Sequence, residues 1–311
     1  MLMYIAKKSI VWVPLIIMAI FVAFMYLIAL SPRPLAFFSS DGTPEAIQAW
    51  RELHGLHEPL LHQFVRYIAG VFRGELGFII MPRAMGGHDL TITPTVTHFT
   101  LYTLRLALTS LFASLALALP VGAIAAAKKN TWIDALIKHL AIVGVSMPIF
   151  ALGMLLITML TPLTEFGVIY LFLLPSITLS FGMFCALVMS TRNSCLKIVR
   201  QNYITSARAN GLPEHKIIFK HILRNTLAPT LSALKMHLGM FFGGIILVEF
   251  LFHRPGIGRL LMQGVLGRNY ALALACVVMF IFSYAALHIV IDIAQAIIDP
   301  RVREWDARVA H

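Results

Sequence analysis

Five long runs without a charged residue restrict the folds that this chain can adopt. They cover residues 9–30, 106–127, 140–164, 166–191 and 269–291, and each is 22 to 26 residues long. A helix needs about 20 mostly apolar residues to cross the hydrocarbon core of a bilayer, so each run is long enough to span a membrane. A sixth run, 236–248, becomes long enough if its helix begins near Leu227 and Lys235 lies against protein or reaches the interface.

Composition and the placement of basic residues support the same conclusion and give an orientation. The chain is 59% hydrophobic and only 13% charged, whereas soluble domains carry about 25% charged residues. With six crossings and a cytoplasmic N-terminus, the cytoplasmic segments hold 15 of the Lys and Arg residues and the outer segments hold 8, as the positive-inside rule requires. The basic residues behind the net charge of +11 therefore lie mostly in segments that connect membrane helices. For this reason nucleic acid is not an expected partner.

These patterns predict an all-α polytopic membrane protein with six transmembrane helices and with both termini in the cytoplasm. The helices are expected near residues 9–30, 98–127, 133–162, 168–191, 227–250 and 270–297. The first run exceeds the apolar core of a usual signal peptide, about 7–15 residues, so it is interpreted as a retained helix. Gly144-Val-Ser-Met-Pro148 should bend the third helix, because proline removes a backbone donor and clashes one turn back.

The whole chain, residues 1–311, is interpreted as one transmembrane domain with two long connections. Residues 31–97 form a predicted periplasmic insertion, in which 45–54 and 59–72 have the apolar spacing of short amphipathic helices. Residues 192–226 form a predicted cytoplasmic segment that is rich in Lys and Arg. The spacing within it predicts a helix over 198–210, a turn at Gly211, and a second helix that starts after Pro213.

A short helix–glycine–helix elbow between two spans has the shape of a rigid knob that a partner's groove can hold. The plainer reading of the same residues is a charged inside loop that only obeys the topology rule. Two phrases in this segment are distinctive: Tyr203-Ile-Thr-Ser-Ala-Arg-Ala-Asn-Gly-Leu212 and His221-Ile-Leu-Arg-Asn-Thr-Leu-Ala-Pro229. They resemble the coupling motif of ABC-importer permeases, and more narrowly the peptide/nickel family of binding-protein-dependent transport systems.

The resemblance covers nearly the whole chain and is densest over residues 200–301. It continues through Gly243-Gly244, Glu249, Phe252-x-x-Pro255-Gly-Ile-Gly-Arg259, Arg268-Asn-Tyr270 and Asp299-Pro-Arg301. There are three departures from the family pattern. Thr205 or Ser206 stands where the general motif has a glutamate, Asn210 stands where lysine is frequent, and Arg254 stands where an aromatic residue is frequent.

The resemblance implies that the elbow is a coupling helix that docks into a separate ATPase subunit. The residues it assigns to ATPase coupling are Ala207, Arg208, Ala209, Gly211, Asn225 and Pro229, the last two at the join to the fifth helix. It implies a bacterial inner membrane location, surrounding lipid, a second homologous permease in a heterodimer, two ABC ATPases and an extracytoplasmic solute-binding protein. The dipeptide Gly-Lys never occurs, so no phosphate-binding loop of the Gly-x-x-x-x-Gly-Lys type exists here. We therefore expect no catalytic residue and no bound cofactor, with ATP and Mg²⁺ held by the partners.

Candidate residues for the translocation pathway or its gate share a position in or near the predicted spans. They are Met147, Pro148, Met236, Met240 and Glu249, and the predicted outer loop adds Pro255, Gly256, Gly258 and Arg259. Intramembrane charges are functional candidates, although pairing inside the bundle is the simpler role, and methionine also fills apolar gaps. His54, His57 and His62 match no tetrahedral metal spacing, so no metal site is predicted.

The sequence leaves the cargo open between nickel or a metal chelate and short peptides. Val145-Ser-Met-Pro148 and Lys235-Met-His-Leu-Gly239 favour nickel slightly. A different class of function, a self-sufficient ion-coupled secondary transporter, stays open. Its weakness is that the sequence offers few buried acidic residues for coupling an ion to transport. A membrane-embedded enzyme is not supported, because neither Gly-x-Ser-x-Gly nor His-Glu-x-x-His occurs.

Overall fold

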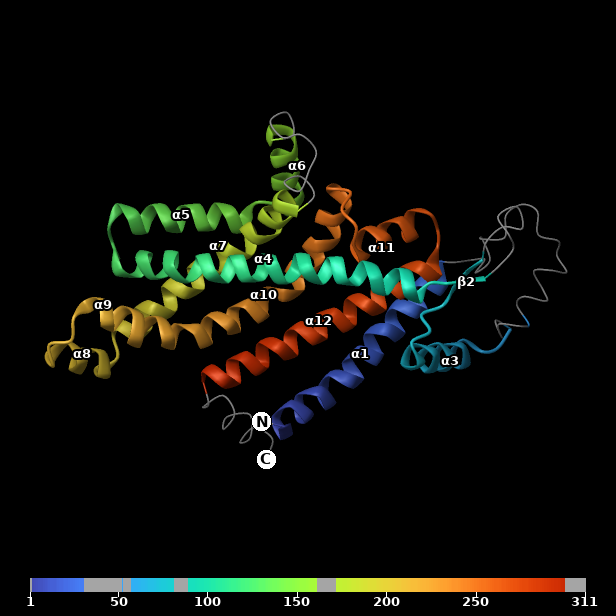
Figure 1. The fold of residues 1–311 in the computed structure, drawn as a ribbon, viewed down its shortest axis with the longest axis horizontal. Helices are drawn as coiled ribbons and strands as arrows, with labels where there is room; N and C mark the ends of the chain where they lie inside the picture. The colour runs from blue at the N-terminus through green and yellow to red at the C-terminus, as the bar shows by residue number, and fades with distance from the viewer. Residues whose placement is uncertain (1, 31–51, 53–56, 81–88, 161–171, 300–311) are drawn as a thin grey trace. The chain divides into compact units, whose positions relative to one another are not determined.

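The computed structural model describes residues 2–30, 52, 57–80, 89–160 and 172–299, and the regular structure of these residues is helical apart from one short pair of antiparallel strands (Figure 1). Their contacts divide the chain into two compact units. Unit 1 comprises Met1–Lys8, Arg105–Arg254 and Ala286–His311, and unit 2 comprises Ser9–Leu104 and Pro255–Ala285. The long helices α4 (Thr93–Ala127) and α12 (Tyr270–Ile298) contribute to both.

Unit 1 is built around α7 (Leu174–Val199) and α10 (Arg224–Leu251), which pack against each other. The helix α5 (Trp132–Ser146) packs on α7, and α6 (Ile149–Leu160) packs on both α7 and α10. Small residues permit the close approach of α5 and α7. A Cβ added at Gly144 would lie 2.3 Å from Cys185 Sγ, so only glycine fits at this crossing.

Unit 2 contains α1 (Leu2–Leu30) from Ser9 onward, α3 (Leu60–Arg73), the strands β1 (Phe78–Ile80) and β2 (Asp89–Thr91), and α11 (Ile257–Leu266). The amphipathic helix predicted over 59–72 is confirmed as α3. Its buried Phe64 packs edge-on against the rings of Phe21 and Phe24. The antiparallel pair β1–β2 was not predicted, and the second short helix, expected over 45–54, lies almost entirely outside the described residues.

By length and composition, four helices of the described chain can cross a membrane: α4, α7, the helix that ends with α10, and α12. The pair α5 and α6 makes a fifth candidate span, and α1 contributes a shorter apolar stretch, Trp12–Leu27, over its described side chains. An all-helical polytopic membrane protein is therefore confirmed in outline. The number of six crossings and the orientation of the termini stay predictions.

The third predicted helix is divided into two helices, α5 and α6, with a sharp change of direction between them. The axis turns by 100° between α5 and α6, at Met147 and Pro148, which makes the pair a broken span or a re-entrant loop. Figure 1 shows α6 leaving the direction of α5 at this point. Pro148 has no N–H, so the carbonyl of Gly144 loses the donor that a continuous helix would offer, and the helix ends. The predicted bend at 144–148 is confirmed in place, and it divides the predicted helix into two.

The basic segment also differs from its predicted outline. The helix α7 runs without a break through residue 192 to Val199, and the helix expected over 198–210 is interrupted at Arg200 and Gln201 before α8 (Asn202–Ala209). Beyond Gly211, α9 (Glu214–Lys216) leads into a π-helix, η4 (Ile217–Leu223), which continues directly into α10. The second predicted helix is therefore the beginning of a long helix and not a separate element.

Candidate functional site: the helical elbow and the cavity at the broken helix

The elbow consists of α8, the turn at 210–213 and α9. Gly211 has φ +73°, the left-handed region that glycine enters without steric cost. Its N–H donates to the carbonyl of Arg208 at 3.0 Å, and the N–H of Leu212 donates to that of Ala207 at 3.2 Å. These two bonds satisfy carbonyls left open at the end of α8. The Arg208 guanidinium also donates across the turn to Glu214, with Nε to Oε1 at 2.7 Å, so the turn has one defined shape.

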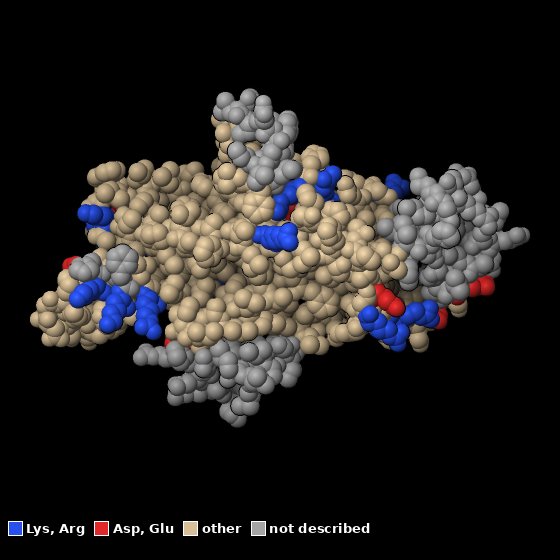
Figure 2. Space-filling model, viewed as in Figure 1, with Lys and Arg blue, Asp and Glu red and all other residues tan. Residues whose placement is uncertain are grey.

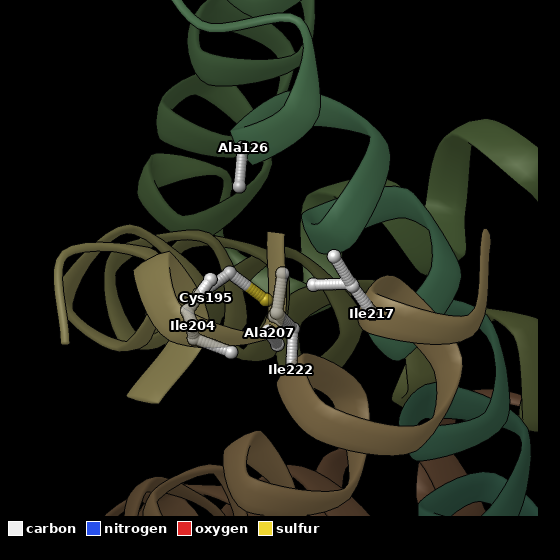
Figure 3. Packing of buried hydrophobic residues seen from close by; sticks show 6 residues of the cluster. All are labelled: Ala126, Cys195, Ile204, Ala207, Ile217 and Ile222. Carbon is white, nitrogen blue, oxygen red and sulfur yellow. The ribbon is translucent and has the colours of Figure 1, made fainter. Parts of the chain in front are cut away.

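A small apolar core fixes the elbow to the helices behind it (Figure 3). It unites α8 with α4, α7 and η4 through six buried residues: Ala126, Cys195, Ile204, Ala207, Ile217 and Ile222. Cys195 Sγ also lies 3.4 Å from Thr226 Oγ1, which ties α7 to the first turn of α10. The elbow is thus an extension of the bundle and not a loop that hangs from it.

The predicted coupling residues divide between the inside and the outside of this elbow. Ala207 is only 8% exposed and packs into the core, so its small side chain sets how closely α8 approaches the bundle. Arg208, Ala209 and Gly211 face outward. Figure 2 shows basic side chains gathered at the end of unit 1 that carries α8 and α9. That surface suits a partner with acidic groups or open carbonyls.

Asn225 and Pro229 lie in the first two turns of α10, after η4, and their role at the join to this helix stays a prediction. Asn225 Nδ2 donates to Tyr203 Oη at 3.1 Å and to the carbonyl of His221 at 2.7 Å, so it links α8 to η4. Pro229 lies inside α10 and cannot donate to the helix, which removes one bond of the regular ladder just after the π-helix. The sequence predicted a join here but not the π-helical register, which has no simple sequence signature.

A cavity of about 480 Å³ opens beside the break between α5 and α6. Its walls come from the end of α5, the start of α6, the middle of α7 and the middle of α10. The lining is mostly apolar and includes Met147, Pro148, Met183, His237, Met240 and Phe241. Irregular backbone at membrane depth is tolerated only where protein or a cavity covers it, so the break and the cavity belong together.

The pathway candidates are not all gathered at this cavity. Met147, Pro148 and Met240 line it, whereas Met236 lies on the exposed face of α10 at 75% exposure and does not. Glu249 is fully buried near the end of α10. Its carboxylate acts on Arg254, a buried residue whose guanidinium carbon lies 4.9 Å from the centre of the Phe172 ring. Burial lowers the pKa of Arg254 and the Glu249 carboxylate opposes that shift.

The comparisons with known proteins agree on one family. Residues 118–304 match the model of the binding-protein-dependent transport system inner membrane component. That is more than half of the chain. The chain belongs to this family. It is 30% identical over 312 residues to the glutathione transport system permease protein GsiC of Escherichia coli strains CFT073 and K12, which covers 97% of this chain and 99% of each relative. A relative of the same name in Salmonella paratyphi A is equally similar.

The chain is therefore the permease component of a binding-protein-dependent ABC importer, a multi-pass protein of the inner membrane. Such a system includes ATPase and solute-binding partners, so the permease is not itself catalytic and binds no cofactor. The described part of the permease has no group of three or more His, Cys, Asp or Glu residues placed to hold a metal ion. Of the outer histidines, His54 lies outside the described residues.

The four outer-loop residues of the permease belong to unit 2, and the loop is shorter than predicted. Pro255 and Gly256 precede α11, whereas Gly258 and Arg259 lie in its first turn. The N–H of Ile257 donates to Thr103 Oγ1 at 2.9 Å and satisfies one open donor of that turn. Gly258 is buried, so its small size serves packing in a helix instead of a turn.

Two buried ion pairs of the permease were missed or only half seen in the sequence. Asp134 and Arg192 pair between α5 and α7 and were not identified at all. Lys235 was noted singly, and the structure pairs it with Asp292 between α10 and α12, with Nζ 2.5 Å from Oδ1. An available signal was that Arg192, Lys235 and Asp292 each border an apolar run, since charges at membrane depth pair or face a cavity.

Proposed function

We propose that this permease forms one half of a translocation pathway, with a second homologous permease as the other half. The observation that carries the proposal is the rigid elbow. Its turn is closed by two backbone hydrogen bonds and an ion pair, and its inner face is packed into the bundle. A partner that presses on Arg208, Ala209 or Gly211 therefore moves α7 and α10 and not only a loop.

Two ATPases would hold the elbows of the two permeases from the cytoplasmic side. When they close on ATP, the elbows approach each other and the bundle changes from inward-open to outward-open. A stiff elbow is needed for this, because a flexible loop would absorb the displacement. ATP and Mg²⁺ stay on the ATPases, and the solute-binding protein delivers the cargo at the outer face, where Pro255, Gly256, Gly258 and Arg259 are the expected loop residues.

The cavity beside the broken helix is the place where we expect the cargo to pass. Met147, Pro148 and Met240 give it an apolar, adaptable wall. The break also leaves the carbonyl of Gly144 without the donor that a continuous helix would offer, and this carbonyl can pair with an amide group of a passing peptide. Met236 extends the same exposed face of α10, and Glu249 would act beyond it as a buried gate residue.

A short peptide is the cargo that we infer, in preference to nickel or a metal chelate. The relatives named as glutathione permeases support a peptide-like cargo, and the mostly apolar cavity, which also has Ser146, Thr178 and His237 in its wall, is consistent with it. The test is ligand capture by the solute-binding protein that serves this permease, followed by mass spectrometry. Recovery of a nickel chelate instead of a peptide would reverse the assignment.

The alternative is a self-sufficient ion-coupled transporter, for which the partly buried Lys235–Asp292 pair is a suggestive feature. Membership of a binding-protein-dependent family weighs against it. Liposomes that hold this chain alone separate the two: solute uptake driven by an ion gradient, without ATPases, would support the alternative.

The elbow itself is tested by Gly211→Val. A Cβ at this position meets nothing within 4 Å, so the substitution strains only the left-handed backbone, by about 1–2 kcal/mol. We expect the variant to insert in the membrane but to lose co-purification with its ATPases and ATP-driven uptake. Gly211→Asn, which tolerates this conformation better, should retain more activity.

Gly74→Val is the matched control, because Gly74 ends α3 with φ +84° and also has open space around its Cβ. It carries the same backbone strain in the predicted outer insertion. ATPase binding should be unaffected in this control. Normal ATP-driven uptake by Gly211→Val would remove the elbow from the mechanism. An equal loss of ATPase binding and uptake in Gly74→Val would do the same.

A further inference from the structure

A buried ion pair joins α5 to α7 just before α7 leads into the elbow. Arg192 donates from Nε to Asp134 Oδ1 at 2.6 Å and from Nη2 to Oδ2 at 2.8 Å. Asp134 is fully buried and Arg192 is 9% exposed, so both bonds are shielded from water. Two parallel hydrogen bonds between a guanidinium and a carboxylate fix orientation as well as distance.

The same carboxylate also holds the turn between α4 and α5. The N–H of Asn130, which has a left-handed φ of 63°, donates to Asp134 Oδ2 at 3.1 Å. Lys138, one helical turn further along α5, places its Nζ 3.9 Å from that oxygen and stays half-exposed. Asp134 thus connects the turn, α5 and α7 at one point.

On the other side of Arg192, α7 is part of the elbow's own core. Cys195, three residues further, packs against Ile204 and Ala207 of α8 and lies within hydrogen-bond distance of Thr226. The end of α7 and the elbow therefore form one packed body, and Arg192 lies at its edge toward α5.

Further along, α5 contacts α7 a second time before it reaches the cavity. Gly144 lies directly against Cys185 and Phe181 of α7. It is ten residues beyond Asp134, or about 15 Å along the helix axis. The next residues of α5 line the cavity and end at the break. A helix held to α7 at two such points moves with α7 and carries the cavity wall with it.

We propose that Asp134 and Arg192 are positioning residues that transmit the displacement of the elbow to α5 and to the wall of the cavity. The proposal rests on the proposed function, since it needs an elbow driven by ATPases. A purely apolar contact would permit α5 to slide along α7 when α7 moves. The bidentate pair prevents sliding, because either helix must break a buried, charged contact to shift.

The experiment follows the cavity wall directly in the complete complex of permeases and ATPases in proteoliposomes. All forms carry Met240→Cys as a reporter, because Met240 borders the cavity and is 76% exposed, while Cys185, Cys195 and Cys276 are buried. The rate of maleimide labelling is measured without nucleotide and with ATP plus vanadate. In Asp134→Asn we expect the ATPases to stay bound and the ATP-dependent change in labelling rate to fall about tenfold, within the range seen for coupling residues.

The set of variants separates transmission from plain stability. Arg192→Lys, which keeps the charge and loses the second donor, should give an intermediate response, and it decides the question if Asp134→Asn does not assemble. The reversed pair Asp134→Arg with Arg192→Asp should restore part of the response. Lys138→Ala removes a charge near the same carboxylate but joins no second helix, so its response should equal the parent's.

Two failures are distinguishable. A parent complex that binds no ATPase, or shows no ATP-dependent change, refutes the proposed function itself. A parent that responds, with Asp134→Asn and Arg192→Lys responding equally, refutes only the transmission by this ion pair.

Discussion

At the scale of single residues, glycine and proline decide where this permease can bend and how closely its helices approach. Gly211 makes the left-handed turn of the elbow, and Pro148 ends α5 where the axis turns by 100°. Gly144 acts differently, since it lies in a regular helix and matters only for its missing side chain. An added Cβ would meet Cys185 Sγ at 2.3 Å and Phe181 Cε1 at 3.0 Å.

Gly144→Ala should therefore destabilise the permease by forcing α5 away from α7. Overpacking of this kind costs about 1–3 kcal/mol, which lowers the unfolding temperature of the purified protein in detergent. Cys185→Ala in the same chain removes the sulfur atom and should recover most of the loss. If the double variant is as unstable as Gly144→Ala alone, the contact with Cys185 is not the cause.

At the scale of elements, polar contacts at membrane depth determine which helices stay together. Lys235 of α10 pairs with Asp292 of α12, whose second oxygen lies 3.4 Å from His288 Nδ1. One turn away, Gln295 Nε2 donates to the carbonyl of Ala228 and to Ser232. These side chains join α10 to the last part of α12.

Asp292→Asn should weaken that join more than replacement of the whole pair. Removal of one partner leaves a partly buried ammonium group uncompensated and costs less than the roughly 3–5 kcal/mol of a fully buried pair, whereas apolar replacement of both partners is often near neutral. The double variant Lys235→Met with Asp292→Leu should therefore unfold at a higher temperature than the single variant Asp292→Asn. The reverse order would indicate that His288 and Gln295 need the carboxylate in place.

The helices themselves were predictable because length and hydrophobicity control them, and helical residues are found in each predicted range, although the third range is divided into α5 and α6. The elbow turn was predictable because Gly211 and Pro213 have strong local preferences. The partnership of Asp134 with Arg192 was not, because it joins residues 58 positions apart and depends on how α5 and α7 pack. The inward position of Ala207 and the π-helical stretch η4 likewise depend on packing, which no local pattern encodes.

At the scale of the whole molecule, the mechanism requires that the elbow and the α4–α5 turn face the cytoplasm and that α3 faces the outside. The three native cysteines are buried, so an introduced cysteine reports its own side of the membrane. Thr205→Cys on α8 and Lys129→Cys in the α4–α5 turn lie at exposed positions, as does Arg73→Cys at the end of α3. A maleimide that cannot cross membranes should label only Arg73→Cys in spheroplasts and only the other two in inverted vesicles, because crossing helices separate them. Labelling of Thr205→Cys from the outside would place the elbow beyond the reach of any cytoplasmic ATPase, and neither the docking nor its transmission to the cavity could then operate.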